Sequence, residues 1–373
     1  MRGAFLVACF ILLLTCRCCS ASLFYRSHSL SSQEGFDEHQ NNRDYMYRYH
    51  HISPPERTRS DVNLFVSQSK ANGRSLLRKP DAAREKSQYR RLANLPGKKG
   101  VAMQLKPSGQ TNSWEQNLPR VIALQPYWNY NWSPYRIDQQ PENIEFVPMI
   151  WGAWSTTGVQ NIINTTIRPA FEAGLVKRLL GFNEPDSTSQ SNIPVALAVQ
   201  CWPYLEMTGM PLASPAVAQI EGSWITDFVN QIESKGLYMD YIAVHWYGFA
   251  DVNGFQSQML SIYQTYNEQW PLLITEFAPA DWSAKTVEEN RFSQQQVLAF
   301  MQEVLPWIEA QDWIDGYAWF PFDETFPPGS TSALFDSAGN LTVLGEYYAS
   351  VSTDNPWGDQ SITFLYSGNT TLF

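Results

Sequence analysis

The chain has little cysteine or histidine beyond its N-terminal stretch. Four of its five cysteines fall within the first 19 residues, and only Cys201 follows them. A lone cysteine forms no intrachain disulfide, so we interpret Cys201 as a small buried residue on a helical pattern. Four of the five histidines precede residue 52, which leaves His245. One histidine and one cysteine exclude an ordinary zinc site with several nitrogen or sulfur ligands, and any nucleophile-histidine triad would need His245.

Positive charge is also scarce in the larger part of the chain. Residues 101–373 carry 28 Asp and Glu against 9 Lys and Arg, whereas residues 23–100 carry 8 against 15. Such an acidic surface repels nucleic acids and polyanionic glycans, so a neutral ligand is favoured. All 14 tryptophans lie in this acidic part. Because uncharged sugars present C–H faces that stack on aromatic rings, a neutral polysaccharide fits the composition.

Long apolar runs are missing after the N-terminus. Residues 4–15 are apolar, follow Arg2 and precede the small residues 20–22, which predicts a signal peptide over residues 1–22 and a protein secreted to the cell wall or medium. The run is shorter than the roughly 20 residues of a spanning helix, so a membrane anchor is the weaker alternative and no membrane association is expected. Residues 23–99 are polar and lack tryptophan, which predicts a disordered leader or linker.

From Gly100 onward, eight short apolar runs recur about every 30 residues, the length of a strand, a helix and their connections. They are residues 101–105, 121–125, 146–150, 179–182, 210–213, 241–245, 272–275 and 316–320. Helical patterns fill several gaps. The longest is predicted to begin with a capping box at Thr286 to Glu289 and to kink or end at Pro306.

Eight such units in about 250 residues predict an α/β fold, a (β/α)8 TIM barrel whose catalytic residues lie at the carboxyl ends of the strands. We place this single catalytic domain at residues 100–350. The remaining residues, 351–373, are predicted to form a C-terminal tail.

Two of the apolar runs end in a glutamate. Glu184 follows the fourth run within Asn183-Glu184-Pro185, and Glu276 ends the seventh. A lone glutamate there is more often a solvated strand end or a helix cap. Strands four and seven face each other across a barrel mouth, however, so these carboxylates can converge on one sugar, as a retaining glycosidase requires. Asn183 is predicted to bond the sugar 2-hydroxyl, and Pro185 to keep the Glu184 backbone extended.

Polar and aromatic side chains gather at the same predicted end of the barrel. We predict that a ring of them contacts substrate together with Asn183: Trp128, Tyr130, Asn131, Trp132, Trp151, His245, Trp246, Tyr247, Trp282 and Trp319. Tyr247 is the predicted orienting partner of Glu276. A structural role is the alternative for His245, and packing is the alternative for any single tryptophan, most readily for Trp154 and Trp282.

Four sequons begin at Asn131, Asn164, Asn340 and Asn369. In a eukaryotic host the last three are predicted glycan sites on exposed loops, which would make the chain a glycoprotein. Asn131 lies at the predicted substrate cleft and is expected to stay unmodified.

With these segments in place, the chain resembles glycoside hydrolase family 128, the endo-β-1,3-glucanases of the retaining (β/α)8 clan. The resemblance spans residues 100–350 and rests on Gly100-Val101-Ala102, Tyr130-Asn131-Trp132-Ser133, Phe146-Val147-Pro148-Met149-Ile150-Trp151-Gly152, Leu180-Gly181-Phe182-Asn183-Glu184-Pro185-Asp186, Ser214-Pro215-Ala216, His245-Trp246-Tyr247-Gly248, Thr275-Glu276-Phe277, Tyr317-Ala318-Trp319-Phe320 and Ser332-Ala333-Leu334-Phe335 to Gly345. It implies that Glu184 is the acid/base, that Glu276 is the nucleophile, and that the substrate is a wall β-1,3-glucan.

The sequence therefore leads to one hypothesis, a secreted, monomeric, retaining endo-β-1,3-glucanase that needs no metal or cofactor. Two alternatives stay open. One is a retaining β-glycanase of another linkage, such as a mannanase. The other is a glucan-binding wall or effector protein, against which the presence of both glutamates argues.

Overall fold

The computed structural model describes residues 97–351, so the predicted signal peptide, nearly all of the leader and the C-terminal tail after Val351 lie outside the described residues. Six strands form one sheet in the order β3-β2-β1-β6-β5-β4, and every neighbouring pair is parallel. Their bounds are β1 (Lys99–Ala102), β2 (Trp128–Tyr130), β3 (Glu145–Phe146), β4 (Ile242–Trp246), β5 (Leu272–Phe277) and β6 (Ile314–Trp319).

Two further extended segments close this sheet into a barrel. Residues 179–183 pair in parallel with Met149, just after β3, and with residues 212–216 through isolated bridges. Residues 212–216 in turn reach the start of β4 through the Ala213–Tyr241 bridge. The eight positions expected of a (β/α)8 barrel are therefore filled. The second one, however, is β2 and not the predicted run 121–125, whose first residues belong to the helix Trp114–Ala123. Glu184 follows the fourth position, and Glu276 lies in β5, which is the seventh.

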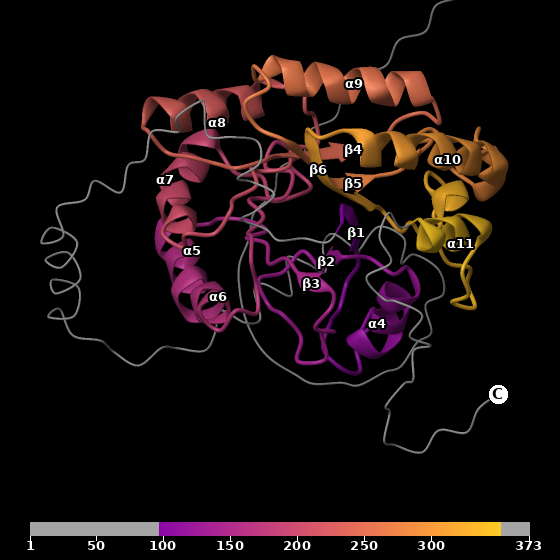
Figure 1. The fold of residues 1–373 in the computed structure, drawn as a ribbon, viewed down its shortest axis with the longest axis horizontal. Coiled ribbons are helices and arrows are strands. Elements are labelled where there is room, and N and C mark those ends of the chain that lie inside the picture. The colour runs from indigo at the N-terminus through magenta and orange to yellow at the C-terminus, as the bar shows by residue number, and fades with distance from the viewer. Residues whose placement is uncertain (1–96, 352–373) are drawn as a thin grey trace, which may run out of the picture.

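Eight α-helices of the described chain surround the strands (Figure 1). They are α4 (Trp114–Ala123), α5 (Thr156–Ile162), α6 (Arg168–Glu172), α7 (Val195–Glu206), α8 (Ser223–Ser234), α9 (Val252–Thr265), α10 (Gln294–Ala310) and α11 (Val343–Ser350). A π-helical turn (Ile163–Ile167) joins α5 to α6, and 3-10 turns occupy Val287–Glu289 and Ser330–Ser332. Within residues 97–351, none of the helices combines the length and hydropathy of a membrane span.

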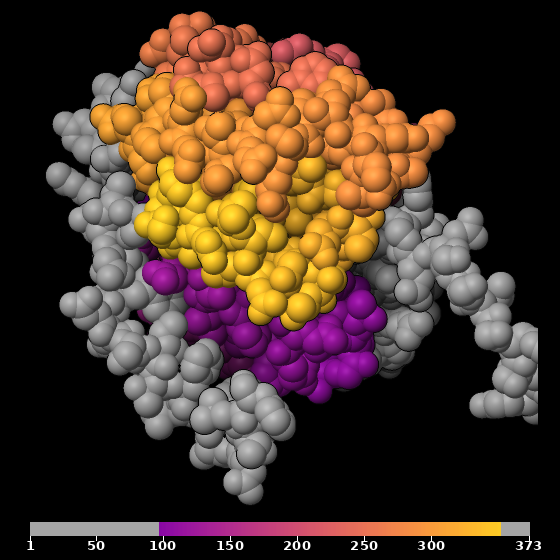
Figure 2. All heavy atoms as spheres, turned by 90° about the vertical axis from the view of Figure 1, so that its right-hand side faces the viewer, coloured from indigo at the N-terminus to yellow at the C-terminus, as the bar shows by residue number. Residues whose placement is uncertain are grey.

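Alternation along the strands separates two buried clusters. Side chains such as Trp128, Tyr130 and Leu273 fill the barrel interior, whereas their neighbours, such as Ile274, pack outward against the helices. Cys201, on α7, is buried in the outer cluster, as predicted. Figure 2 shows the first and last parts of the described chain packed side by side, in agreement with the pairing of β1 and β6.

For the longest helix the predicted start was wrong, and of the two outcomes predicted at Pro306 the helix does not end there. Thr286 precedes only the 3-10 turn and its side chain caps nothing, while α10 begins after Ser293, which forms the capping box with Gln296. The helix also continues through Pro306 to Ala310. Proline provides no N–H for the carbonyl four residues earlier, that of Gln302, but the Tyr347 hydroxyl donates to this oxygen at 3.5 Å. The packing of α11 against α10 thus compensates for part of the cost of the proline.

Strand β5 contains a bulge beside the predicted nucleophile. Val244 and His245 of β4 pair with Ile274 and Glu276, so β5 has one extra residue there, and a register shift relative to β6 falls in the same interval. Ile274 and Phe277 both pack in the outer cluster. Simple alternation would have placed Glu276 on the outward side with Ile274. The extra residue turns its side chain into the barrel, a common use of bulges near active sites.

Candidate active site

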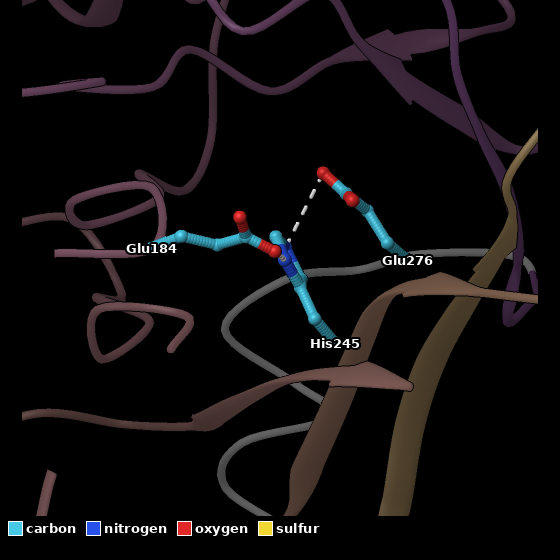
Figure 3. A group of neighbouring side chains, drawn as sticks. All are labelled: Glu184, His245 and Glu276. Carbon is cyan, nitrogen blue, oxygen red and sulfur yellow. Dashed lines mark hydrogen bonds and ion pairs between the residues drawn. The ribbon is translucent and has the colours of Figure 1, made fainter. Parts of the chain in front are cut away.

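Three side chains from three different strand positions converge at the carboxyl end of the barrel. Figure 3 shows Glu184, His245 and Glu276 pointing toward one another. One carboxylate oxygen of each glutamate and one ring nitrogen of His245 all lie within 4.8 Å of one another. Glu276 and His245 are buried, whereas the Glu184 side chain keeps 15% of its surface exposed. The two glutamates predicted from the sequence are therefore neighbours, and Glu184 is the more accessible to solvent.

Neutral donors surround the carboxylate of Glu276. Tyr130 and Trp132 donate hydrogen bonds to its Oε1 at 2.9 and 2.8 Å, and Tyr247 donates to its Oε2 at 2.5 Å. The bond predicted between Tyr247 and Glu276 is thus present. Burial and the negative charge of Glu276 raise the pKa values of Tyr130 and Tyr247 well above their ordinary range, so both hydroxyls stay protonated as donors. Both carboxylate oxygens are therefore held in fixed directions.

Replacing Tyr247 with phenylalanine is expected to lower turnover of the substrate by about 10- to 100-fold, because a charged hydrogen bond to Glu276 is lost while the ring is kept. The measurement is kcat and KM of the purified variant. Tyr347→Phe is the matched control, because its hydroxyl makes only a long bond on the surface. Unchanged kcat in Tyr247→Phe would mean that this bond does not orient the carboxylate for reaction.

His245, a predicted sugar contact with a structural role as the alternative, lies between the two glutamates. Its Nδ1 is 3.0 Å from Glu184 Oε1, and its Nε2 is 3.3 Å from Glu276 Oε1, close enough for an ion pair but without hydrogen-bond geometry. Burial opposes protonation of the ring, but the charges of Glu276 and Glu184 and the bond to Glu184 outweigh it and raise the pKa of His245. A protonated His245 would offset part of the negative charge that the two carboxylates bring together.

This raised pKa predicts a pH-dependent contribution to stability. A group whose pKa is higher in the folded state stabilises that state fully below its unfolded value, about 6.5 for histidine, and loses the contribution as pH rises through the folded value. The wild-type Tm should exceed that of His245→Gln by several degrees, on the order of 3 °C, at pH 5.5, and the gap should narrow by pH 9. Thermal unfolding curves across this range test the sign. A gap that is flat or widens with pH would contradict it.

The backbone at Glu184 was predicted to be extended because Pro185 follows, and this was wrong. Its φ is +40°, in the left-handed region that costs a non-glycine residue about 1 to 3 kcal/mol. Surrounding bonds impose this conformation. The Glu184 N–H donates to Ala216 O at 2.6 Å, and the Asp186 carboxylate accepts the N–H groups of Ala218 and Gln219 at 2.8 and 2.9 Å. The segment after residues 212–216 thus fixes the direction of the Glu184 side chain.

The cluster of Glu184, His245 and Glu276 could also hold a cation, judged by the spacing of its donor atoms. The surroundings of Glu276 suit a carboxylate whose charge is met by hydrogen bonds, because Tyr130, Trp132 and Tyr247 all point N–H or O–H donors at it. A metal ion would compete with these N–H and O–H groups for the same oxygens. The arrangement is therefore suited to carboxylate chemistry.

Three of the predicted sugar contacts need correction because they pack in the core. Trp246 stacks on Phe300 beneath α10, and Trp319 donates its Nε1 to Ser332 O on the outer side of the sheet. Trp128 lies inside the barrel, but its Nε1 donates to the carbonyl of Lys98, before β1, at the opposite end from the glutamates. All three side chains are buried. They have no surface to offer a sugar, so we do not retain them in the site.

The remaining predicted contacts divide by environment. Asn131, Trp151 and Asn183 are buried, yet each keeps one polar side-chain atom without a protein partner, namely Asn131 Oδ1, Trp151 Nε1 and Asn183 Oδ1. The Asn183 Nδ2 donates to Gln190 Oε1 at 3.3 Å. Trp282 and Trp154 are 60% and 55% exposed, so the suggestion that these two most readily belong to packing was wrong. Burial of Asn131 agrees with an unmodified sequon there. Asn164 and Asn340 are exposed, but Asn164 lies in the π-helical turn and not in a loop as predicted, and Asn369 lies outside the described residues.

Sequence reasoning missed residues that act through neighbours. Phe320 and Phe322, after β6, form edge-to-face and tilted contacts with the Tyr247 ring at 5.5 and 5.6 Å between centroids. Gln190 accepts a hydrogen bond from Asn183, and Asp186 ties the segment after Glu184 to the backbone of Ala218. The aromatic residues directly after the eighth apolar run were a signal that could have indicated Phe320 and Phe322. No comparable signal marked Gln190, which lies in a polar loop.

The described part of the chain is similar to known proteins. The family model described as "Glycosyl hydrolase catalytic core" matches residues 100–348. Alkali-sensitive linkage protein 1 of Schizosaccharomyces pombe is 28% identical over 233 residues, which cover 60% of this chain and 40% of that protein. The chain thus spans about two fifths of the length of this curated relative.

Solved structures of glycoside hydrolase family 128 share the fold. A subgroup I endo-β-1,3-glucanase from Amycolatopsis mediterranei, in complex with laminaripentaose, is 26% identical with a TM-score of 0.56 over 68% of this chain and 99% of its own. A subgroup II endo-β-1,3-glucanase from Sorangium cellulosum is 25% identical with a TM-score of 0.51 over 68% and 98%. Both are similar to the part of the chain that forms the barrel.

Proposed function

This chain belongs to the glycosyl hydrolase catalytic core family, and from that membership we propose that it is a retaining endo-β-1,3-glucanase with Glu184 as acid/base and Glu276 as nucleophile. The observation that carries the proposal is the approach of the two carboxylates at the carboxyl end of the barrel, where one oxygen of each lies within 4.8 Å of the other. Retaining glycosidases hold their carboxyl groups about 5 to 5.5 Å apart, whereas inverting enzymes need about 6.5 to 9.5 Å to admit a water. The shorter spacing supports the retaining scheme.

In the first proposed step, a Glu276 oxygen attacks the anomeric carbon while Glu184 gives its proton to the glycosidic oxygen. The bond between that carbon and the glycosidic oxygen breaks, and an ester to Glu276 forms. The fixed directions of the Glu276 oxygens lower the cost of orientation, because Tyr130, Trp132 and Tyr247 have placed them before substrate arrives. The partial exposure of Glu184 suits a group that must exchange protons with water.

In the second step, the Glu184 carboxylate takes a proton from water, and the resulting oxygen attacks the anomeric carbon. The ester bond breaks and Glu276 returns to its carboxylate form. His245 lies against both glutamates in each step, and a protonated ring there would offset part of the negative charge, whichever of the two glutamates is ionised. Two displacements at the same carbon return the original β configuration.

The substrate assignment rests on relatives. The Amycolatopsis and Sorangium proteins are endo-β-1,3-glucanases, and the former holds a laminarin oligosaccharide in its structure. The acidic balance of residues 101–373 agrees with a neutral glucan. The S. pombe relative is named for an alkali-sensitive linkage, and secretion to a wall remains part of the proposal for this chain.

The direct test is incubation of the purified secreted protein with laminarin, beside mannan, cellulose and mixed-linkage glucan. Short oligosaccharides released early from laminarin, with NMR showing β anomers as the first product, would support retaining endo action. Preferential cleavage of mannan would establish a β-glycanase of another linkage. Laminarin binding by a folded protein that releases no sugar would establish a glucan-binding protein.

A further inference from the structure

The loop between β5 and α10 presents a tryptophan to solvent. Trp282 is 60% exposed, and its ring meets Tyr247, Phe322 and Phe326 edge to face, with centroids 5.8, 6.3 and 6.4 Å away. The Tyr247 hydroxyl in turn holds Glu276. Trp282 therefore contacts a residue that itself bonds the proposed nucleophile.

A buried carboxylate fixes this loop on both sides of Trp282. Asp281 is almost fully buried, and its Oδ1 accepts the N–H and hydroxyl of Ser283 at 3.1 and 2.6 Å. Its Oδ2 accepts the N–H of Arg291 and forms an ion pair with the Arg291 Nε, both at 3.0 Å. We call Asp281, Ser283 and Arg291 the clamp. An exposed tryptophan on a loop is ordinary, but one whose two neighbours are both held in a multiply bonded clamp is positioned.

The clamp also reaches the neighbouring loop after β4. The Arg291 guanidinium lies over the ring of Phe249, 5.1 Å from its centroid, and donates to Ser283 Oγ at 2.7 Å. Phe249 is 59% exposed and follows Tyr247 by two residues. One guanidinium thus packs on Phe249 and bonds both residues that flank Trp282. Phe249 is close to Tyr247 in sequence, and Trp282 contacts it in space.

We propose that Trp282 and Phe249 form a distal platform that binds glucosyl units beyond those at Glu184 and Glu276, with Asp281 as its positioning residue. This inference rests on the proposed function. Neutral sugars cover aromatic rings with their C–H faces, and covering two exposed rings removes apolar surface from water. The contact of Trp282 with Tyr247 makes the platform continuous with the site, which identifies its occupant as the same glucan chain.

The test is calorimetric binding of laminarihexaose and laminaribiose to the full chain carrying Glu276→Gln, so that substrate is not consumed. Adding Trp282→Ala should weaken laminarihexaose binding about tenfold and leave laminaribiose unchanged, because only a longer chain reaches the platform. Trp282→Phe, which keeps a ring, should restore most of the affinity. Asp281→Asn should weaken hexaose binding in the same length-dependent way although Trp282 is present.

Leu260→Ala serves as the control, because this exposed side chain lies on α9 and outside the clamp. Equal hexaose affinity of Trp282→Ala and its parent, equal loss for both oligosaccharides, or a dimer of the parent that Trp282→Ala dissociates would overturn the platform. Normal affinity in Asp281→Asn would overturn the positioning role. A wild-type protein that cleaves laminarin while Trp282→Ala binds normally defeats the platform alone, whereas a folded wild-type protein that neither binds nor cleaves laminarin defeats the proposed function.

Discussion

Replacing Glu276 with glycine is expected to reduce kcat on laminarin by roughly four orders of magnitude or more, because no other carboxylate can form the ester to the anomeric carbon. Azide should restore turnover of this variant. The small anion fits the space of the missing side chain, attacks the carbon from the same side, and expels the leaving oxygen, which takes its proton from Glu184. The product is then a glycosyl azide of inverted configuration, which NMR identifies.

The same experiment has two internal checks. Glu276→Gln should be equally inactive but should not respond to azide, because its side chain still fills the space. Glu303→Gln, an exposed position on α10, should keep wild-type kcat. A fully active Glu276→Gln enzyme, with its fold confirmed by the thermal transition, would end the scheme of two glutamates.

Replacing Glu184 with glutamine is expected to lower kcat on laminarin by about a thousandfold, within the range of general acid/base catalysis. The effect should depend on the leaving group. A dinitrophenyl β-laminaribioside needs little protonation, so its first step should survive and release one equivalent of phenol in a burst. The sugar then remains on Glu276, because Glu184 is no longer there to activate water.

Mass spectrometry of this variant should therefore show the chain plus one laminaribiosyl group on the peptide that contains Glu276. If both the burst and laminarin hydrolysis were lost, Glu184 would have a role in the first step beyond protonation. Steady hydrolysis of the aryl substrate at the wild-type rate would show that another group activates water.

The meeting of Glu184 and Glu276 was predictable because a barrel brings the residues that end its strands to one mouth, and strand ends are visible in sequence. Glu184 and Glu276 each close an apolar run. The bridging position of His245 was not predictable in this way. It depends on the closure of the barrel, which places the end of β4 between the two carboxylates, and strand spacing in sequence does not report that distance.

The aromatic residues were harder for a physical reason. Whether a strand tryptophan points inward or outward depends on the phase of the strand, and whether an inward one reaches the site depends on the end of the barrel at which it lies. Trp128 is inward but at the far end, while Trp246 and Trp319 are outward. Conversely, Trp282 is exposed because Asp281 and Arg291 fix its loop, and these residues are ten apart in sequence. The start of α10 lies in the same segment, at Ser293 and not at the predicted Thr286.

The extra residue in β5 has a consequence for recognising this chemistry in other sequences. Successive residues of a regular strand face alternate sides of the sheet, so one added or removed residue exchanges the sides of all the residues that follow it. Here Ile274 and Phe277 both face outward although they are three positions apart, so the interval holds one extra residue, and Glu276, next to Phe277, faces inward. A relative that lacks the extra residue keeps its glutamate inward, because the glutamate then lies between two outward residues. A relative with the same number of residues but no bulge would point the glutamate at the helices. The side that the glutamate faces is therefore indicated by the outward aromatic residue that follows it, and not by a count from the start of the strand.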